Sequence, residues 1–186
     1  MANRRTFSAF APFCIAEWVY QKKGSKDLYR LRDASLLDPL LLLRTSYSHL
    51  TAASAIARNI LASQMSLQSA PNLYALLQSY LQRLAQFDNP NTLSLSFVLK
   101  LLTHEGLLSI RPQCALCNNE ALAIKEGESL CHDHSSLQDV FFSSEEWKTV
   151  LLLTHAKQFS LLQQIEISDP LEEKITESVG TFFSKK

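Results

Sequence analysis

Several features that are common in enzymes and membrane proteins are missing from this sequence. Only four of its 186 residues are glycine, which argues against a β-sandwich or barrel throughout. No apolar run reaches the ~18 residues that a bilayer crossing needs, and the basic start MANRRTFSAF is not followed by the apolar stretch of a secretory signal. The sequence shows no internal repeat, glycine-rich phosphate loop, Gly-x-Ser-x-Gly or recognisable nucleophile arrangement. We therefore expect a cytoplasmic protein that does not cross a membrane and is not an enzyme.

Neither sign of charge is in excess, because the formal net charge is zero. The distribution is nevertheless uneven: residues 1–58 contain nine Lys and Arg against four Asp and Glu, whereas residues 59–186 contain nine against fourteen. A basic first part can mark a surface that faces a polyanion, and chance scatter of solvated side chains explains it equally well. The 46% hydrophobic content is enough for a core of ordinary size.

Cysteine is scarce, yet three of the four cysteines fall into a metal-binding pattern. Cys114 and Cys117 are two residues apart, and Cys131 and His134 repeat that spacing after thirteen intervening residues. Each Cys-x-x-Cys or Cys-x-x-His turn presents two soft ligands to one point, and a tetrahedral zinc ion needs two such turns. We predict one zinc ion held by Cys114, Cys117, Cys131 and His134. Four protein ligands leave no open position for water, so the zinc is expected to be structural.

The alternatives to this site are weaker. His132 could replace His134 as the fourth ligand, but Cys-x-His makes a poorer turn than Cys-x-x-His. Ordinary buried thiols would not be expected to pair in this way. A catalytic zinc of the deaminase type requires His-x-Glu followed by Pro-Cys-x-x-Cys. Here the His and Glu are adjacent and a glutamine separates the proline from the cysteine, so both halves of that pattern fail.

Residues 7–32 are expected to form a β-hairpin. FSAFAPFCIAEWVY mixes aromatic and β-branched residues, QKKGSKD is typical of a turn, and LYRLRD follows as a second strand. Aromatic and basic residues alternate in this part, as in surfaces that bind single-stranded nucleic acid. A solvated hairpin tip with its aromatic side chains in the core is the alternative. The basic residues concerned are Arg4, Arg5, Lys22, Lys23 and Lys26.

The hydrophobic period changes to that of helices from Asp38 onward. Asp38 as cap and Pro39 at the first helical position predict a long helix over residues 39–65. Its expected inward side chains are Leu42, Leu43, Tyr47, Leu50, Ala53, Ala57, Ile60 and Leu61.

The later helices carry clear start and stop patterns. Helices are predicted over residues 72–87 and 92–108, with Gly106 ending the second. Ser143 and Glu146 form a capping-box pattern that opens another helix. A short helix over 158–166 and a last one opened by Asp169 complete the chain.

This order of features resembles the bacterial recombination mediator family RecO. SFVLKLLTHEGLLSIRPQCALC contains the apolar helix, glycine, spacer and Cys-x-x-Cys with which the zinc module of that family usually begins, and NLYALLQSYLQRL resembles the helix before it. The resemblance covers roughly residues 5–183. It implies a mainly α fold, a helical bundle carrying a zinc-finger-like module and preceded by an incomplete OB-fold-like β hairpin. The corresponding divisions are a partial OB-fold-like segment at 1–36 and a helical domain at 37–186, with the zinc module at 111–136.

The sequence departs from the family pattern in two places. His134 stands where many members have cysteine, which keeps the zinc prediction because histidine is an equally good ligand. The OB-fold of the family also needs more residues than the 36 or so that precede the helices here. Its first half is therefore expected to be absent, either because the true start lies upstream or because the chain is a fragment or a reduced member.

The resemblance implies a role in recombinational DNA repair. RecO-like proteins bind single- and double-stranded DNA, anneal complementary strands, and act with RecR to load RecA onto strands coated by single-strand-binding protein. Arg4, Arg5, Lys22, Lys23 and Lys26 would then contact phosphates, and the helical body would bind the tail of single-strand-binding protein through an apolar groove with a basic rim. Such a protein is expected in the cytoplasm, associated with the nucleoid. A zinc-stapled helical adaptor that binds protein and no nucleic acid is the alternative, and a salt-dependent DNA affinity would separate the two.

Overall fold

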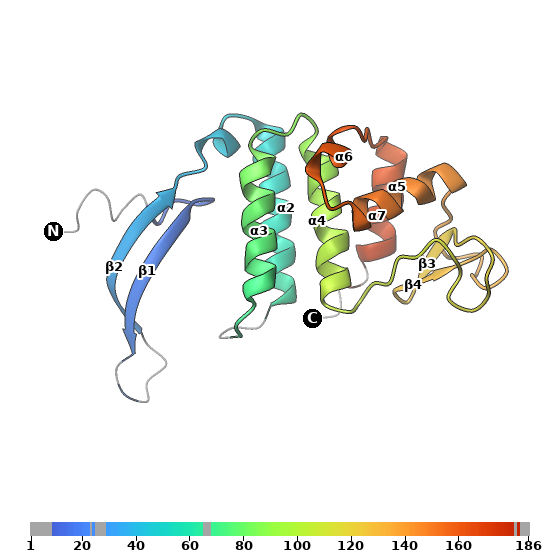
Figure 1. Cartoon of the computed structure of the whole chain (residues 1–186), viewed down its shortest axis with the longest axis horizontal. Helices are drawn as coiled ribbons and strands as arrows, with labels where there is room; N and C mark the ends of the chain where they lie inside the picture. Colours follow the sequence, from blue (N-terminus) through green and yellow to red (C-terminus); the bar gives the residue numbers. More distant parts are fainter. Residues whose placement is uncertain (1–8, 23, 25–28, 65–67, 181, 183–186) are drawn as a thin grey trace.

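The computed structural model describes residues 9–22, 24, 29–64, 68–180 and 182. A β-hairpin lies at one end of the molecule, helices form its centre, and a small second hairpin lies at the other end (Figure 1). The described fold is thus mainly helical. Its elements are β1 (Ile15–Lys22), β2 (Tyr29–Asp38), the 3-10 helix η1 (Leu41–Arg44), α2 (Tyr47–Ser63), α3 (Pro71–Leu84), α4 (Pro90–His104), β3 (Ala123–Lys125), β4 (Glu128–Leu130), α5 (Ser144–His155), α6 (Phe159–Gln163) and α7 (Asp169–Gly180).

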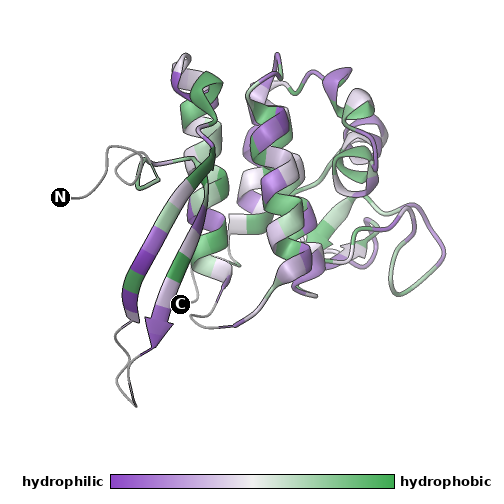
Figure 2. Ribbon diagram, turned by 60° about the vertical axis from the view of Figure 1, so that its left-hand side comes forward, coloured by the Kyte–Doolittle hydropathy of each residue, from purple (hydrophilic) through white to green (hydrophobic). Residues whose placement is uncertain are grey.

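The predicted N-terminal hairpin is present, and its second strand is longer than expected. β1 and β2 pair antiparallel, with a register shift next to Val19. Hydrophobic and hydrophilic residues alternate along part of β2, whereas β1 ends in a hydrophilic stretch at Gln21 and Lys22 (Figure 2). Tyr20 pairs with Leu31 on one face, and Gln21 pairs with Arg30 on the other. All four of these side chains are exposed, so residues on both faces of the hairpin reach the surface.

The helix predicted from Pro39 begins instead at Tyr47, so this part of the prediction is wrong. The Asp38 carboxylate accepts the backbone N–H of Leu40 at 2.9 Å, which closes a turn. Leu40 then adopts a left-handed conformation with φ of 43°, and only a single 3-10 turn follows before α2. Asp-Pro is a turn signal as well as a helix-start signal, because an Asp side chain binds a nearby N–H in both structures.

The inward face of α2 also differs from the prediction. Ala53 is buried as predicted, but Ala52 and Ile56 are buried as well, whereas Tyr47 is 87% exposed and Leu61 is 79% exposed. The short alanine side chains let the backbones of α2 and α4 approach closely, and these two helices make extensive contact. The large side chains of the predicted stripe therefore lie mostly outside the core.

Helix α4 is the centre of the packed core. It lies between α2 and α3 on one side and α5 to α7 on the other (Figure 1). Ten of its fifteen residues are buried, including polar ones. The Ser96 hydroxyl donates to the carbonyl of Leu153 at 2.6 Å and lies 2.9 Å from the Tyr80 hydroxyl. Burial raises the pKa of Tyr80 to about 12, so this tyrosine is neutral and pairs within the core.

The predicted stop and start signals around the metal-binding segment are confirmed, although α4 is shorter at its C-terminal end than the predicted range of 92–108. α4 ends at His104, Gly106 follows with φ of +70°, and the N–H of Leu107 donates back to the carbonyl of Leu102 at 2.9 Å. α5 begins with the expected capping box between Ser143 and Glu146. None of the helices in the described part of the chain combines the length and apolarity that a membrane crossing requires.

Candidate metal centre and neighbouring groove

The metal-binding segment contains the hairpin β3–β4 and, before it, a loop closed by an isolated bridge between Gln113 and Glu120. β3 and β4 are joined by Glu126 and Gly127, both with positive φ, as in a type I′ turn. The carbonyl of Gly127 accepts the N–H of Ser109 at 2.7 Å, which ties the turn to the segment after α4. A Cβ at Gly127 would lie 2.1 Å from the carbonyl oxygen of Leu107, so only glycine fits this close approach.

The structure brings together the side chains of Cys114, Cys117, Cys131 and His134. Their ligand atoms all lie within 4.8 Å of one another. The Cys117 and Cys131 Sγ atoms are 3.6 Å apart, and His134 Nδ1 lies 3.3 Å from Cys131 Sγ and 3.5 Å from Cys114 Sγ. A disulfide would need sulfur atoms at ~2.05 Å, so all three thiols are free.

These separations fit a single metal ion at the centre of the group. Zinc bonds of ~2.3 Å to sulfur and ~2.0 Å to nitrogen, arranged tetrahedrally, place two sulfur atoms about 3.8 Å apart and a sulfur and a nitrogen atom about 3.5 Å apart. The three separations lie within about 0.2 Å of these values. Three sulfurs and one imidazole are also a donor set that favours zinc over harder metals.

The pKa values of the cysteine thiols also support a metal site. Burial opposes ionisation of Cys114, but hydrogen bonds from the N–H groups of Cys131, Leu116 and Cys117 outweigh it and lower the pKa of Cys114 to about 6. The N–H of Asn119 favours the Cys117 thiolate, yet burial and the neighbouring sulfurs raise the pKa of Cys117 overall. One thiol thus ionises readily at the expense of another, and a bound cation would allow all three to be thiolates.

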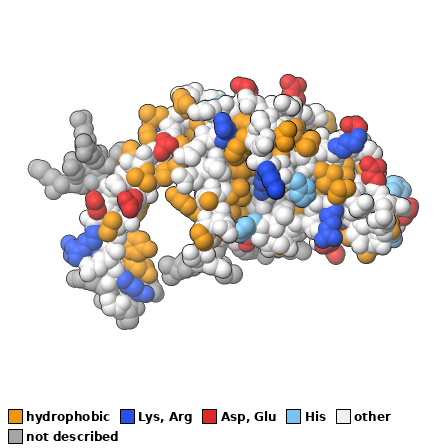
Figure 3. Space-filling model, in the orientation of Figure 1, with side chains coloured by type: hydrophobic (Ala, Val, Ile, Leu, Met, Phe, Trp, Pro, Cys, Tyr) orange, Lys and Arg blue, Asp and Glu red, His pale blue; other side chains and the backbone are white. Residues whose placement is uncertain are grey.

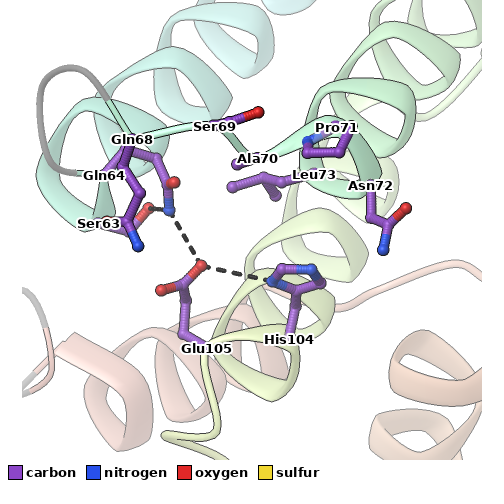
Figure 4. Close-up of a pocket in the computed structure, with 10 residues that line it drawn as sticks. All are labelled: Ser63, Gln64, Gln68, Ser69, Ala70, Pro71, Asn72, Leu73, His104 and Glu105. Carbon is purple, nitrogen blue, oxygen red and sulfur yellow. Dashed lines mark hydrogen bonds and ion pairs between the residues drawn. The ribbon is translucent and has the colours of Figure 1, made fainter.

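Two other histidines considered from the sequence lie outside this group. His132 packs against the Phe141 ring, with ring centroids 5.2 Å apart. His104 and Glu105 line a pocket where α2 and α4 end and α3 begins (Figure 4). There Gln64 and His104 both reach the Glu105 carboxylate, at 3.0 and 3.4 Å. His104 and Glu105 therefore form a local hydrogen bond and are not part of the cysteine cluster.

The candidate DNA-binding residues are described only in part. Arg4, Arg5, Lys23 and Lys26 lie outside the described residues. Lys22 is exposed, and its Nζ lies 5.7 Å from the centre of the Tyr29 ring. Trp18 is 46% exposed and Tyr20 is 63% exposed, so these aromatic side chains are not part of the core. Figure 3 shows acidic side chains toward the base of the hairpin and basic ones toward its tip.

Reasoning from the sequence did not locate an apolar groove beside the metal module. The groove runs along α5 to the start of α6 and has a volume of about 820 Å³. Its basic groups are exposed, and none of the described residues that line it is acidic. The signal was present in the run VLLLTHAK, which has more leucines than one buried helix face needs, followed by a histidine and a lysine; of these leucines Leu152 is exposed. The lining residues are Pro112, Lys148, Leu151, Leu152, His155, Ala156, Lys157, Gln158 and Leu161.

The fold and the site define a class: a helical domain with a two-knuckle Cys3His module at one end and a β-hairpin at the other. Comparison with known proteins identifies the family. The family described as "Recombination protein O C terminal" matches residues 44–186, and the chain belongs to this RecO family.

Individual relatives agree with this assignment. The DNA repair protein RecO of Chlamydia pneumoniae is 31% identical over 168 residues, which cover 88% of this chain and 66% of that protein. The protein of the same name from Chlamydia trachomatis serovar D is 30% identical over 179 residues, covering 94% of this chain and 73% of the relative. The one from Syntrophobacter fumaroxidans is 23% identical over 167 residues, covering 86% and 66%. The chain thus spans about two thirds of the length of these relatives.

Proposed function

We propose that this chain acts in recombinational DNA repair as a mediator without catalytic activity. It would bind single- and double-stranded DNA through the hairpin and the tail of single-strand-binding protein through the groove. The observation that carries the proposal is the family match over residues 44–186, together with relatives named DNA repair proteins. Annealing of strands, action with RecR and loading of RecA extend the proposal and rest on the family alone.

The hairpin supports the DNA-binding part. Trp18, Tyr20 and Tyr29 are exposed near a basic tip, and a flat ring beside a cation is what a single-stranded base and its phosphate require. Arg30 is exposed on the opposite face, so phosphate contacts are available on both sides of the hairpin. We propose that the two strands belong to an OB-fold-like surface, in agreement with the use of such folds for single strands.

The groove supports the protein-binding part. Leu152 is 47% exposed and Leu161 is 44% exposed, which provides an apolar floor. Lys157 is exposed at the rim, and Lys148 is engaged with Glu145 at 2.7 Å outside the groove. An apolar floor with a basic rim complements a peptide that is acidic and has apolar side chains at its end.

The metal is proposed to be one structural Zn²⁺ ion. Cys114, Cys117, Cys131 and His134 would hold it, and no fifth ligand would be needed. When bound, the ion supplies folding free energy to the module. The protein is proposed to act in the cytoplasm with the nucleoid.

The DNA-binding proposal is tested by the affinity for single-stranded DNA at two salt concentrations. Because phosphate contacts release counterions, the affinity should fall as salt rises. Replacing Lys22, Lys23 and Lys26 together by Ala should lower the affinity and reduce the salt slope by about 2–3. A matched control removes the same charge elsewhere, through Arg58→Ala, Arg83→Ala and Lys125→Ala, and should leave the slope nearly unchanged.

Two results would count against DNA binding by the hairpin. An equal loss of slope in both triple variants would mean that net charge alone determines the affinity. If the metal-loaded chain shows no salt-dependent DNA binding at all, the adaptor interpretation replaces this part of the proposal.

The groove is tested separately with a fluorescent peptide that carries the C-terminal sequence of a bacterial single-strand-binding protein. Leu152→Asp should abolish binding, because it places a carboxylate on the apolar floor near an acidic ligand. Leu61→Asp, an equally simple change at an exposed leucine of α2, is the control and should bind normally. Equal binding by both variants would contradict the assignment of the groove.

A further inference from the structure

One short segment connects the metal module to the groove. Pro112 lines the groove, and the two residues before it are bound to α5. The carbonyl oxygen of Ile110 accepts a hydrogen bond from His155 Nε2 at 2.8 Å. The carbonyl oxygen of Arg111 accepts one from the Trp147 indole N–H at 3.2 Å. His155 also lines the groove, so the segment before Pro112 is bonded to a residue of the groove itself.

On its other side, Pro112 is held by the first knuckle of the metal module. Its carbonyl oxygen accepts the N–H of Ala121 at 3.0 Å, and the N–H of Cys114 donates to the carbonyl of Asn119 at 2.9 Å. Cys114 and Cys117, inside this loop, are two of the four candidate ligands. The neighbouring strands β3 and β4 have three residues each, and a hairpin this short is marginal without further support.

The two sides of the groove therefore depend on different forces. Leu151 and Leu152 lie on α5, which packs against α4 in the helical core. Pro112 depends instead on a loop whose folding free energy would come largely from metal binding. Release of the ligands would therefore affect the position of Pro112 more than that of the two leucines.

We propose that the metal module is a positioning element of the groove, so that metal occupancy sets the affinity for the acidic, apolar peptide. With the four ligands bound to a metal ion, Pro112 forms a fixed wall. Without the ion that wall is lost, and the hydrogen bond from Trp147 to Arg111 opens more often. The ligand in this inference rests on the proposed function, whereas the coupling of the cluster to Arg111 and Pro112 can be measured without any ligand.

The first experiment measures binding of the same fluorescent peptide to the full chain, once loaded with zinc and once after removal of the metal by a chelator. Loss of one apolar wall is expected to weaken binding about tenfold. Cys131→Ser should show the same loss without chelator, whereas Cys14→Ser, at a cysteine outside the cluster, should bind as the parent does. Pro112→Gly should retain the metal and still bind more weakly.

The second experiment follows hydrogen exchange of the Trp147 indole N–H by NMR. The chain has two tryptophans, so Trp18→Phe leaves a single indole signal to assign. Metal removal should accelerate the exchange, because the carbonyl of Arg111 no longer holds a fixed position. The exchange rate of the same indole N–H in the metal-loaded chain is the reference for this comparison.

The outcomes are distinct. Weaker peptide binding together with faster indole exchange supports the coupling. An indole exchange rate that metal removal leaves unchanged overturns it, whether or not peptide binding changes. If the zinc-loaded chain does not bind the peptide at all, the tail-binding function fails, and the exchange measurement alone then decides the coupling: acceleration supports it and no change overturns it.

Discussion

Gly127 occupies a position that no larger side chain can share. Its φ is +88°, and an added Cβ would meet the backbone carbonyl of Leu107 at 2.1 Å. Gly127→Ala is therefore expected to lower the free energy of unfolding by about 3 kcal/mol, through both left-handed strain and displacement of the backbone. Denaturant unfolding monitored by circular dichroism measures this change.

Gly106 provides the matched control for that substitution. Its φ is +70°, but an added Cβ would meet nothing within 4 Å. Gly106→Ala should thus cost only the conformational strain, about 1 kcal/mol. Equal costs at the two glycines would show that the contact between the Gly127 turn and Leu107 does not constrain the module.

Glu146 gives the stability of the protein a defined pH dependence. The Lys174 ammonium and then the Ser143 N–H lower the pKa of this carboxyl below its ordinary value of 4.5. The stabilisation is fully present above the unfolded pKa, and it disappears as pH falls through the lower folded pKa. Glu146→Gln should cost about 1 kcal/mol at neutral pH, and the difference from the parent should vanish in acid.

The control for Glu146 is its neighbour Glu145. The ion pair of Glu145 with Lys148 is on the surface, with side chains 84% and 62% exposed. Glu145→Gln should therefore change the free energy of unfolding little at any pH. A pH profile of Glu146→Gln that runs parallel to the parent down to strong acid would contradict the assigned role.

At the level of elements, the two knuckles should depend on the metal while the helices do not. Cys131→Ser removes one of four ligands, so zinc content should fall from one per chain to near zero, and the thermal midpoint should fall by about 5 °C. Cys14→Ser leaves the cluster intact and should change neither quantity. A Cys131→Ser protein that keeps both its metal and its midpoint would exclude a structural metal site.

The elements differ in how far the sequence could predict them. The helix that stops just before Gly106 and the helix opened by Ser143 and Glu146 were predictable, because their stop and start signals are local and agree with the hydrophobic period. The start of α2 was not, since Asp38 closes a turn with Leu40 instead of capping a helix. The inward face of α2 was predicted only in part: Ala53 is buried as expected, but packing against α4 also buries Ala52 and leaves the large Tyr47 exposed.

The two candidate sites also differ in how far the sequence could predict them. Two pairs of ligands with the same spacing each place two side chains at one point. The cluster of Cys114, Cys117, Cys131 and His134 could therefore be anticipated from the sequence. The groove could not, because Pro112 and Leu161 are far apart in the chain and meet only through tertiary packing around α5. Spacing predicts sites built within one segment and does not predict surfaces built from several.

For the whole molecule, stability should be concentrated around α4. Leu101 is fully buried in this helix, and Leu101→Ala should cost about 2–5 kcal/mol. Tyr20 lies on the exposed hairpin, so Tyr20→Ala is expected to change the free energy of unfolding by less than about 1 kcal/mol. Thermal and urea unfolding of both variants would measure the contrast, and similar costs would show that the hairpin belongs to the same cooperative unit as the helices.

The hairpin and the groove lie toward opposite ends of one helical body (Figure 1). A single chain could therefore hold a nucleic-acid strand at one end and a peptide at the other without either ligand displacing the other. The nucleic-acid strand and the peptide can both belong to one protein-coated strand. Binding of one of them then holds the other near its own site at a high effective concentration. Two weak contacts then give a combined avidity well above either affinity, and only ligands that present both features at a matching separation gain from it.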